Sequence, residues 1–408
     1  MPVWRAENEQ EPPDARRLHT EVSAAAVRRR RLDAVRAGMV DAGVDVLLLS
    51  HGADLPWLTG YRAMPLERLT MLVLPVDGDA VLVVPGLEAP RVPDLAGAVE
   101  LRPWGDTEDP VALVGALVGA AAVRPAPSGV LSRPVHLGIS ERAWAATVVA
   151  LQAQLPGATW DIASVVTGPL RAVKDESEVA ALRAAGAAAD TVARALQGGE
   201  IPLVGRSERD VSADIAQRLL DAGHQQVNFA IVGSGPNGAS PHHQAGSRTV
   251  GPGEIVVCDF GGTLALDGEV VGYCSDITRT VAVGEPSPEV LEAYEVLERA
   301  QAAAVAAVRP GVRAEEVDAV ARGVIAEAGL GDRFIHRTGH GIGVEEHEAP
   351  YLVAGDRTVL AAGHTFSVEP GIYVPGRFGM RLEDIVVVTE RGVELLNTAP
   401  RHLAVLDA

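Results

Sequence analysis

The feature that most constrains this chain is a set of acidic residues inside apolar, strand-like segments of its C-terminal half. Asp259 ends one such segment, Asp276 lies in the next, and Glu369 and Glu383 occupy two later ones. An ionised side chain in an apolar strand is costly unless it meets a cation or a hydrogen-bonding partner. A single acidic residue in a strand is more often on its wet face, but Asp259 and Asp276 would repel each other across one hairpin. Because a metal ion would turn this repulsion into attraction, the set predicts a metal site.

Histidine completes the candidate ligand set. The segment GHGIGVEEHEAP supplies His340 and His347 among glycines that allow the backbone to approach closely. A lone histidine is more often an ordinary surface or core residue, so His340 is a candidate only together with the four carboxylates. Such a set suits hard or borderline divalent ions such as manganese, cobalt or zinc. It indicates a pair of ions more than one structural zinc, which prefers cysteine and histidine.

One glycine-rich segment imitates a dinucleotide site. The sequence VGSGPNGASPHH has G-x-G-x-x-G spacing after a predicted strand near residues 228–232. The nucleotide-binding fingerprint requires a helix to begin within the glycines, whereas Pro236 and Pro241 interrupt this segment. We therefore reject a dinucleotide cofactor and predict a sharp bend that presents His242 and His243.

The length of 408 residues is too great for one ordinary domain and suits two. The first part alternates helix and strand, which predicts an α/β domain over residues 1–168. Its expected helices lie near residues 17–42, 109–123 and 140–154, and its expected strands near residues 46–49, 70–75, 80–85 and 136–138. Because this domain contains few clustered acids or histidines, its sequence indicates no catalytic or metal site of its own.

A second domain is predicted over residues 169–408, with the boundary near residues 165–172. Asp175 and Glu178 resemble a capping box that opens a long Ala-rich helix. Further helices are expected near residues 207–222, 288–308 and 314–328, and the ligand-bearing strands include a hairpin that turns at Asp267-Gly268. Helices and strands in blocks, rather than in strict alternation, indicate an α+β domain.

Charge limits the expected partners. The chain has 35 Lys and Arg against 54 Asp and Glu, a net charge of −19, and so acidic a surface repels phosphate backbones. Nucleic acid is therefore not an expected partner. The basic run Arg28 to Arg31 lies in a helical pattern with Val27, Leu32 and Val35 as apolar positions, and we interpret it as a solvated helix face.

The sequence also indicates the compartment. Its first residues, MPVWRAENEQEPPD, lack the apolar core of a secretion signal, which predicts a cytoplasmic protein. The longest apolar run, residues 111–123, is too short to cross a bilayer, so no membrane contact is expected. Cys258 and Cys274 cannot build a disulfide framework, and we expect both to be buried free thiols.

Five ordered segments, DFGG, SDITRT, TGHGIG, VEPGIY and RLEDI, resemble the metal-ligand motifs of the pita-bread metallopeptidases, in the Xaa-Pro branch that contains aminopeptidase P and prolidase. The resemblance is strong over residues 170–400. It extends weakly into the first domain through RLDAVRAGMVDAGVDVLLLSHGADLPWLTGY. It implies a creatinase-like α/β first domain, a pita-bread catalytic domain, and two divalent metal ions, with manganese favoured over cobalt or zinc.

The resemblance gives each candidate ligand a role in binding the two ions. It implies that Asp259 chelates one ion, that Asp276 and Glu383 bridge both, and that His340 and Glu369 bind the second. The hairpin between the first two ligands is longer than is usual in the family. Asp267 lies in it, but its place in an Asp-Gly turn makes it a poor competing ligand.

Further residues match positions around the ions. His242 and His347 match two substrate-facing histidines of the family, and Arg381, on the same strand face as Glu383, matches an arginine that orients carboxylates. The implied mechanism is attack of metal-activated water on the scissile carbonyl. Glu369 is the expected acid and base for the water proton, and His347 is expected to stabilise the oxygen on which charge develops.

By the same resemblance the chain is an Xaa-Pro aminopeptidase-like hydrolase that cleaves small peptides before a second-position proline. The family precedent also implies a homodimer or higher homo-oligomer, in which the first domain closes the partner's site. Trp57 and Tyr61 are candidates for that contact, although a core role is more usual for aromatic residues. The alternatives are a strict Xaa-Pro dipeptidase (prolidase), a metal-dependent amidohydrolase of a small metabolite, and a non-catalytic binding module on the same fold.

The preferred peptide length depends on one position. Some dipeptidases of this family place an arginine directly after the His-Glu-x-Pro segment, where it binds the carboxylate of the proline. Here Tyr351 follows that segment, and a tyrosine cannot form the charged fork that an arginine makes with a carboxylate. The sequence therefore favours an aminopeptidase P-like enzyme, unless Arg333, Arg337 or Arg377 reaches the same carboxylate by another path.

Overall fold

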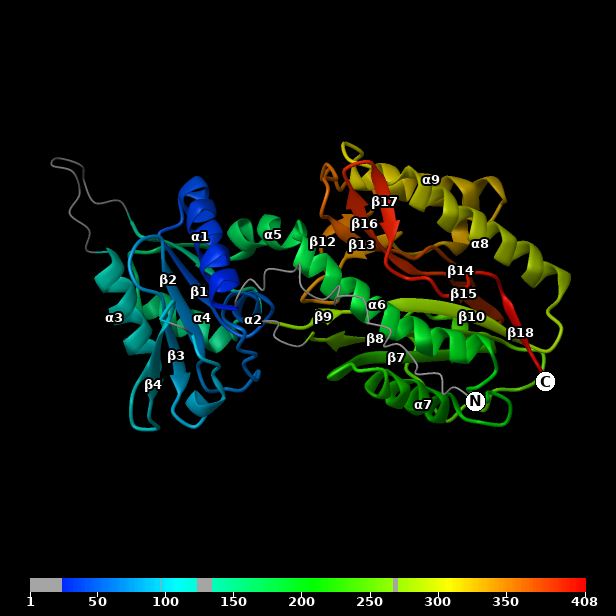
Figure 1. Cartoon of the computed structure of the whole chain (residues 1–408), viewed down its shortest axis with the longest axis horizontal. Coiled ribbons are helices and arrows are strands. Elements are labelled where there is room, and N and C mark those ends of the chain that lie inside the picture. Colours follow the sequence, from blue (N-terminus) through cyan, green and yellow to red (C-terminus); the bar gives the residue numbers. More distant parts are fainter. Residues whose placement is uncertain (1–23, 96, 123–133, 267–270) are drawn as a thin grey trace, which may run out of the picture.

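The computed structural model describes residues 24–95, 97–122, 134–266 and 271–408. An N-terminal α/β domain lies beside an α+β domain, and α5 (Ser164–Ala172) and α6 (Glu176–Gln197) carry the chain from one to the other (Figure 1). The predicted order of fold classes is thus confirmed. The predicted division between residues 168 and 169 falls inside α5 and stays a prediction.

The N-terminal domain is built on one six-stranded sheet in the order β4-β3-β2-β1-β5-β6. Its strands are β1 (Val46–Leu49), β2 (Met71–Pro75), β3 (Val81–Pro85), β4 (Glu100–Trp104), β5 (His136–Ile139) and β6 (Thr159–Ile162). Its helices are α1 (Ala24–Ala42), α2 (Asp54–Thr59), α3 (Pro110–Ala122) and α4 (Ala145–Gln154). The central strand β1 is fully buried, because one core packs α1 on one face and a second core packs α3 and α4 on the other.

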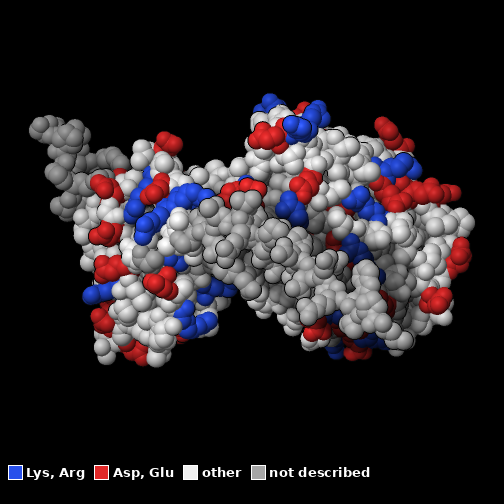
Figure 2. All heavy atoms as spheres, in the orientation of Figure 1, with Lys and Arg blue, Asp and Glu red and all other residues white. Residues whose placement is uncertain are grey.

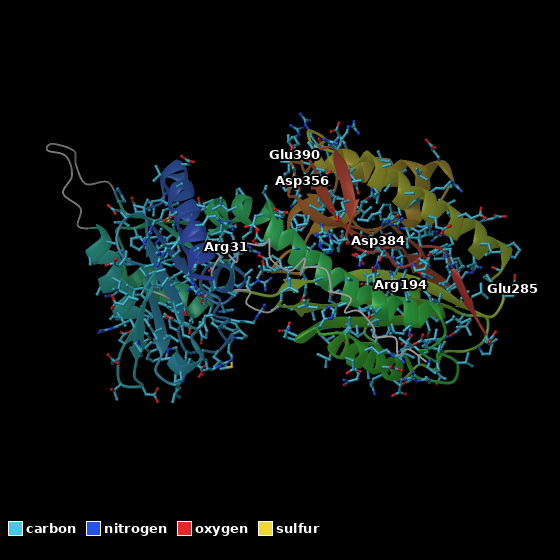
Figure 3. All side chains as sticks on the ribbon, in the orientation of Figure 1. Arg31, Arg194, Glu285, Asp356, Asp384 and Glu390 are labelled. Atoms are coloured by element: carbon cyan, nitrogen blue, oxygen red, sulfur yellow. The ribbon has the colours of Figure 1, made fainter. Side chains whose placement is uncertain are left out.

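The basic run in α1 is only half solvated. Arg29 and Arg30 are exposed as expected, but Arg28 and Arg31 are buried, so their interpretation as part of a solvated face is wrong. Arg28 donates to two backbone carbonyls. Arg31, which is labelled in Figure 3, forms an ion pair with Glu178 of α6 at 2.9 Å. Carbonyls and a carboxylate thereby replace water around the two buried guanidiniums.

The second domain contains two five-stranded sheets and a two-stranded ribbon. The first sheet has the order β18-β10-β8-β7, with β9 paired to β8. Its strands are β7 (Gln226–Ser234), β8 (Ile255–Leu264), β9 (Tyr273–Cys274), β10 (Ile277–Val283) and β18 (Ala404–Leu406). The second sheet, in the order β12-β11-β13-β16-β17, comprises β11 (Gly339–Gly341), β12 (Glu348–Leu352), β13 (Thr365–Val368), β16 (Asp384–Thr389) and β17 (Gly392–Leu395). The ribbon pairs β14 (Gly371–Val374) with β15 (Phe378–Arg381).

Helices cover both sheets of this domain. They are α6, α7 (Glu208–Asp221), α8 (Pro288–Ala307) and α9 (Ala314–Glu327). One core joins α6 and α7 to the first sheet, and another joins α8 and α9 to the second (Figure 1). The predicted capping box of α6 is confirmed: Asp175 accepts from the Glu178 N–H at 3.0 Å, and the Glu178 carboxylate accepts from the Asp175 N–H at 2.9 Å.

The glycine-rich segment does not open an α-helix. Gly235–Ala239 forms a short 3-10 helix, which agrees with the rejection of a dinucleotide site. Two predicted features lie outside the described residues: the first turns of the N-terminal helix, at residues 17–23, and the Asp267-Gly268 turn.

Four other side chains that the sequence singles out are buried. Cys258 and Cys274 are free thiols, as predicted, and Trp57 and Tyr61 lie in the core of the first domain. In the part of the chain that the structure describes, no helix is both long enough and apolar enough to span a membrane. Acidic and basic side chains are intermixed over the face seen in Figure 2.

Candidate metal centre

Strands from both sheets of the second domain supply the predicted ligands. Asp259 lies within β8, and Asp276 immediately precedes the neighbouring strand β10. The other sheet supplies His340 from β11, Glu369 directly after β13, and Glu383 directly before β16. Antiparallel pairing of β8 with β10, and of β13 with β16, therefore fixes the separation of residues that are far apart in the chain.

The position of His340 depends on the glycine before it. A Cβ atom on Gly339 would lie 1.8 Å from the carbonyl oxygen of Ser367, so no larger residue fits unless the strands separate. This close approach lets the His340 N–H donate to Ser367 Oγ at 3.0 Å. Because His340 Nδ1 donates to the carbonyl of Gly341 at 3.2 Å, Nε2 is the nitrogen left for a ligand.

Four of the predicted ligands meet at this imidazole. Asp276, His340 and Glu383 each offer a ligand atom within 4.8 Å of those of the other two. Glu369 joins them, because its Oε1 lies 3.2 Å from His340 Nε2, while Asp276 Oδ2 lies 3.7 Å from the same nitrogen. The four side chains are nearly or fully enclosed.

Arg381 connects the fifth ligand to this group. Its NH2 ion-pairs with Asp259, and its Nε lies 3.9 Å from Glu369 Oε2. The same Nε donates to Thr278 Oγ1 at 3.0 Å, and the threonine hydroxyl donates to Glu383 Oε2 at 2.7 Å. One buried guanidinium thus orients three carboxylates, directly or through a hydroxyl.

The site carries more negative charge than its own side chains balance. Asp259 Oδ1, Asp276 Oδ1 and Glu383 Oε1 are buried, and none has a hydrogen-bond partner among the described residues. Burial, reinforced by neighbouring carboxylates, raises the pKa of Asp276 and of Glu383 well above the usual range. Burial likewise raises the pKa of Glu369 to about 7. Oxygens without donors and carboxyls that resist ionisation both fit a site that divalent cations complete.

The histidines predicted to face the substrate lie at the exposed side of this cluster. His347 is exposed, and its ring centroid is 4.0 Å from that of His340. Burial of part of the ring lowers the pKa of His347. His242 is also exposed, whereas its neighbour His243 is held 2.7 Å from the buried carboxylate of Glu208. Of the two histidines that this loop presents, His242 is therefore the one open to a substrate.

Two further side chains that were not expected from the sequence reach the cluster. Tyr373 accepts from Arg381 NH1 at 2.9 Å and donates to His336 Nε2 at 2.8 Å. Burial first, and then the charge of Arg381, lower the pKa of His336 to about 3, so that its ring is neutral and accepts this hydrogen bond. The spacing of His336 from His340, in the segment HRTGH, is a signal that could have indicated it.

Comparison with known proteins decides the family. The family model of metallopeptidase family M24 matches residues 180–390 of this chain. The family model of the creatinase/prolidase N-terminal domain matches residues 31–173. The chain belongs to metallopeptidase family M24. A Mycobacterium tuberculosis relative, the probable dipeptidase PepE, is 46% identical over 96% of this chain and 99% of its own length. A Xaa-Pro dipeptidase of Lactobacillus delbrueckii subsp. lactis is 36% identical over 92% of this chain and 98% of its own.

A solved structure of a similar protein has the same fold over nearly the whole chain. The crystal structure of recombinant prolidase from Thermococcus sibiricus matches with a TM-score of 0.84 and 34% identity, over 93% of this chain and 99% of that one. The expected creatinase-like first domain and pita-bread catalytic domain are therefore confirmed. As an M24 member the chain is a metallopeptidase, and the family implies divalent metal ions.

Proposed function

We propose that this M24 metallopeptidase hydrolyses the peptide bond between an N-terminal residue and a following proline. In this proposal two divalent ions are held by Asp259, Asp276, His340, Glu369 and Glu383. The observation that carries it is a group of three carboxylates around one imidazole, joined to a fourth carboxylate through Arg381, with three buried oxygens that lack donors among the described residues. Because oxygen donors predominate in this set, manganese is the ion that we expect first.

The residues around the ions have separate tasks. Two such ions would polarise the scissile carbonyl and lower the pKa of a shared water. Glu369, whose carboxylate lies 3.2 Å from His340 Nε2 in the ligand group, would accept the proton of that water and return it to the leaving nitrogen. Arg381 keeps Asp259 oriented through their ion pair. In this proposal His347 donates to the oxygen on which negative charge develops, and His242 holds the substrate; the exposure of both rings and the contact of His347 with His340 support these roles.

The requirement for proline rests on the relatives. The Lactobacillus protein is described as a Xaa-Pro dipeptidase and the Thermococcus protein as a prolidase, and they match 92% and 93% of this chain. A fold alone does not determine the substrate. We therefore base the proposed specificity for proline on two observations together: the similarity to these relatives and the cluster of metal ligands.

We further propose the dipeptidase mode, although Tyr351 by itself favours the aminopeptidase mode. The guanidinium carbon of Arg337 lies 4.6 Å from the centroid of the Tyr351 ring. Burial, and after it the charge of Arg337, lower the pKa of His347, which supports a role for this cation near the proposed substrate. Among the described residues Arg337 forms no ion pair, so it can bind a carboxylate, whereas Arg377 already pairs with Glu289 at 2.7 Å.

A small set of peptides tests these proposals. The manganese-loaded protein is given Ala-Pro, Ala-Pro-Ala and Ala-Ala, and the products are followed by mass spectrometry. We expect alanine release from both proline peptides, with kcat/KM for Ala-Pro at least about tenfold higher, a difference of roughly 1.4 kcal/mol. Equal hydrolysis of Ala-Ala would contradict the proline requirement, and a preference for Ala-Pro-Ala would contradict the dipeptidase mode. Failure to cleave any of the three would reject the peptidase proposal as a whole.

A further inference from the structure

A buried group of ion pairs lies directly behind His347. The carboxylate of the next residue, Glu348, is held by two cations: Lys174 Nζ is 2.5 Å from Oε1, and Arg171 NH2 pairs with Oε2. The side chain of Lys174 is 1% exposed, that of Glu348 8% and that of Arg171 10%. A buried carboxylate with a cationic donor on each oxygen has little freedom to move, because any shift leaves a charge unpaired.

The same ion pair supports the loop that follows His340. A Cβ atom on Gly343 would lie 2.5 Å from Glu348 Oε1 and 3.0 Å from Lys174 Cε, so the backbone of Gly343 rests on the pair itself. Lys174 is fixed in turn, because its backbone N–H donates to the carbonyl of Gly363 at 2.8 Å. The loop between residues 343 and 348 therefore depends on the Lys174–Glu348 pair for its position.

Arg171 extends this group to the N-terminal domain. Its NH1 lies 3.0 Å from Asp54 Oδ1 at the start of α2, and its NH2 lies 3.0 Å from Glu345 Oε2. A cavity of about 320 Å³ lies alongside, lined by these three residues together with His347 and Glu348. A continuous chain of contacts thus runs from the first domain to the residue beside His347.

We propose that Lys174 and Arg171 are positioning residues for His347. By fixing Glu348 they hold the neighbouring imidazole where it meets the reacting oxygen, and Arg171 makes that position depend on the first domain through Asp54. The inference rests on the proposed function, in which His347 contacts the substrate.

Loss of one cation is expected to lower the rate more than binding. In Lys174→Met, Glu348 keeps one charged partner and can move, and a displacement of about 1 Å at a reacting group can cost roughly a hundredfold in rate. His340 is anchored separately, by its strand and by Ser367 Oγ, so the metal content should not change. An interaction made mainly in the transition state appears in kcat rather than in KM.

The test compares Lys174→Met and Arg171→Met with a matched control, Arg31→Met. Arg31 forms an equally buried ion pair with Glu178 across the same domain junction. With manganese bound, we expect kcat for Xaa-Pro hydrolysis to fall at least about tenfold in the first two variants, with KM within about threefold and metal content unchanged. The control should lose stability but stay within about threefold of the wild-type kcat. Equal losses of kcat in all three variants, or a wild-type kcat in Lys174→Met, would overturn the proposal.

A conservative variant covers the case in which Lys174→Met does not fold. Arg171→Lys keeps a cation opposite Glu348, and we expect it to retain at least about half of the wild-type kcat, whereas Arg171→Met does not. Equal kcat values in these two variants would count against the proposal.

A double variant separates positioning from general damage. Because Lys174 acts through His347, adding Lys174→Met to His347→Ala should cost no more than about twofold in kcat. A further tenfold loss would show that Lys174 acts elsewhere and would overturn the inference. Failure of the proposed function itself is distinguishable, because it appears as absence of Xaa-Pro hydrolysis in the wild-type protein.

Discussion

Replacing Glu369 by glutamine should stabilise the metal-free protein, and more so at high pH. Glu369 is mostly buried beside other carboxylates, and burial raises its pKa from the usual 4.5 to about 7. The folded state therefore binds this proton more tightly than the unfolded state does. Glu369 accordingly destabilises the metal-free fold increasingly as the pH rises from 4.5 through 7, and the neutral amide of Glu369→Gln removes that penalty.

The size of the effect follows from the pKa difference. At roughly 1.4 kcal/mol for each pKa unit, the shift corresponds to about 3 kcal/mol once the carboxyl is ionised in both states, as at pH 8. At pH 5 the folded-state carboxyl keeps its proton, and the penalty is about 1 kcal/mol. The stabilisation by Glu369→Gln should therefore grow by about 2 kcal/mol between pH 5 and pH 8.

Urea unfolding of chelator-treated protein at the two pH values measures this change. The matched control is Glu327→Gln, which removes an exposed carboxylate at the end of α9 and should show no comparable pH dependence. If Glu369→Gln is no more stabilising at pH 8 than at pH 5, or if the control behaves in the same way, the buried cluster does not carry the charge that we infer.

Three other variants probe individual roles. Asp276→Asn should lose bound metal by elemental analysis because a proposed bridging ligand loses its charge, and full metal occupancy would remove Asp276 from the ligand set. His347→Ala should keep its metal but lose at least about a hundredfold in kcat, as when an oxyanion donor is removed, and wild-type activity would show that its role is misassigned. Arg337→Met should lower kcat/KM for Ala-Pro at least about tenfold, because a charged hydrogen bond to the carboxylate is lost. The surface variant Arg377→Met is its control, and equal effects on Ala-Pro and Ala-Pro-Ala would refute carboxylate binding by Arg337.

The ligand cluster could be predicted because its acidic members interrupt runs of apolar residues that otherwise predict buried strands. Asp276 and Glu383 are acidic residues within apolar strand segments, and the structure buries both of them. Gly339, which precedes His340, is a similar signal, because a glycine is required where two strands approach too closely for a side chain. Each of these signals can be recognised within a few residues of sequence.

Other parts depend on contacts that no local pattern encodes. From its sequence context Tyr373 resembles an ordinary core residue of an apolar strand. Its hydrogen-bond partner Arg381 lies on a different strand, β15, so the sequence around Tyr373 does not indicate the contact. The burial of Arg31 depends on Glu178, which is 147 positions away, so the helical pattern of α1 alone suggested a solvated face. The strands β4 and β6 escaped prediction because most of their residues are exposed, so neither shows the buried apolar run that marks β1, β2 and β3. The helix α2 has only six residues, too few for a helical periodicity.

Titration of the chelator-treated protein with manganese tests the central claim most directly. Calorimetry counts the ions bound, and Ala-Pro hydrolysis is measured on the same samples. We predict no hydrolysis without metal, two ions bound per chain, and full activity only as the second ion binds. Full activity in the metal-free protein, or full activity with a single bound ion, would contradict a two-metal hydrolase at this site.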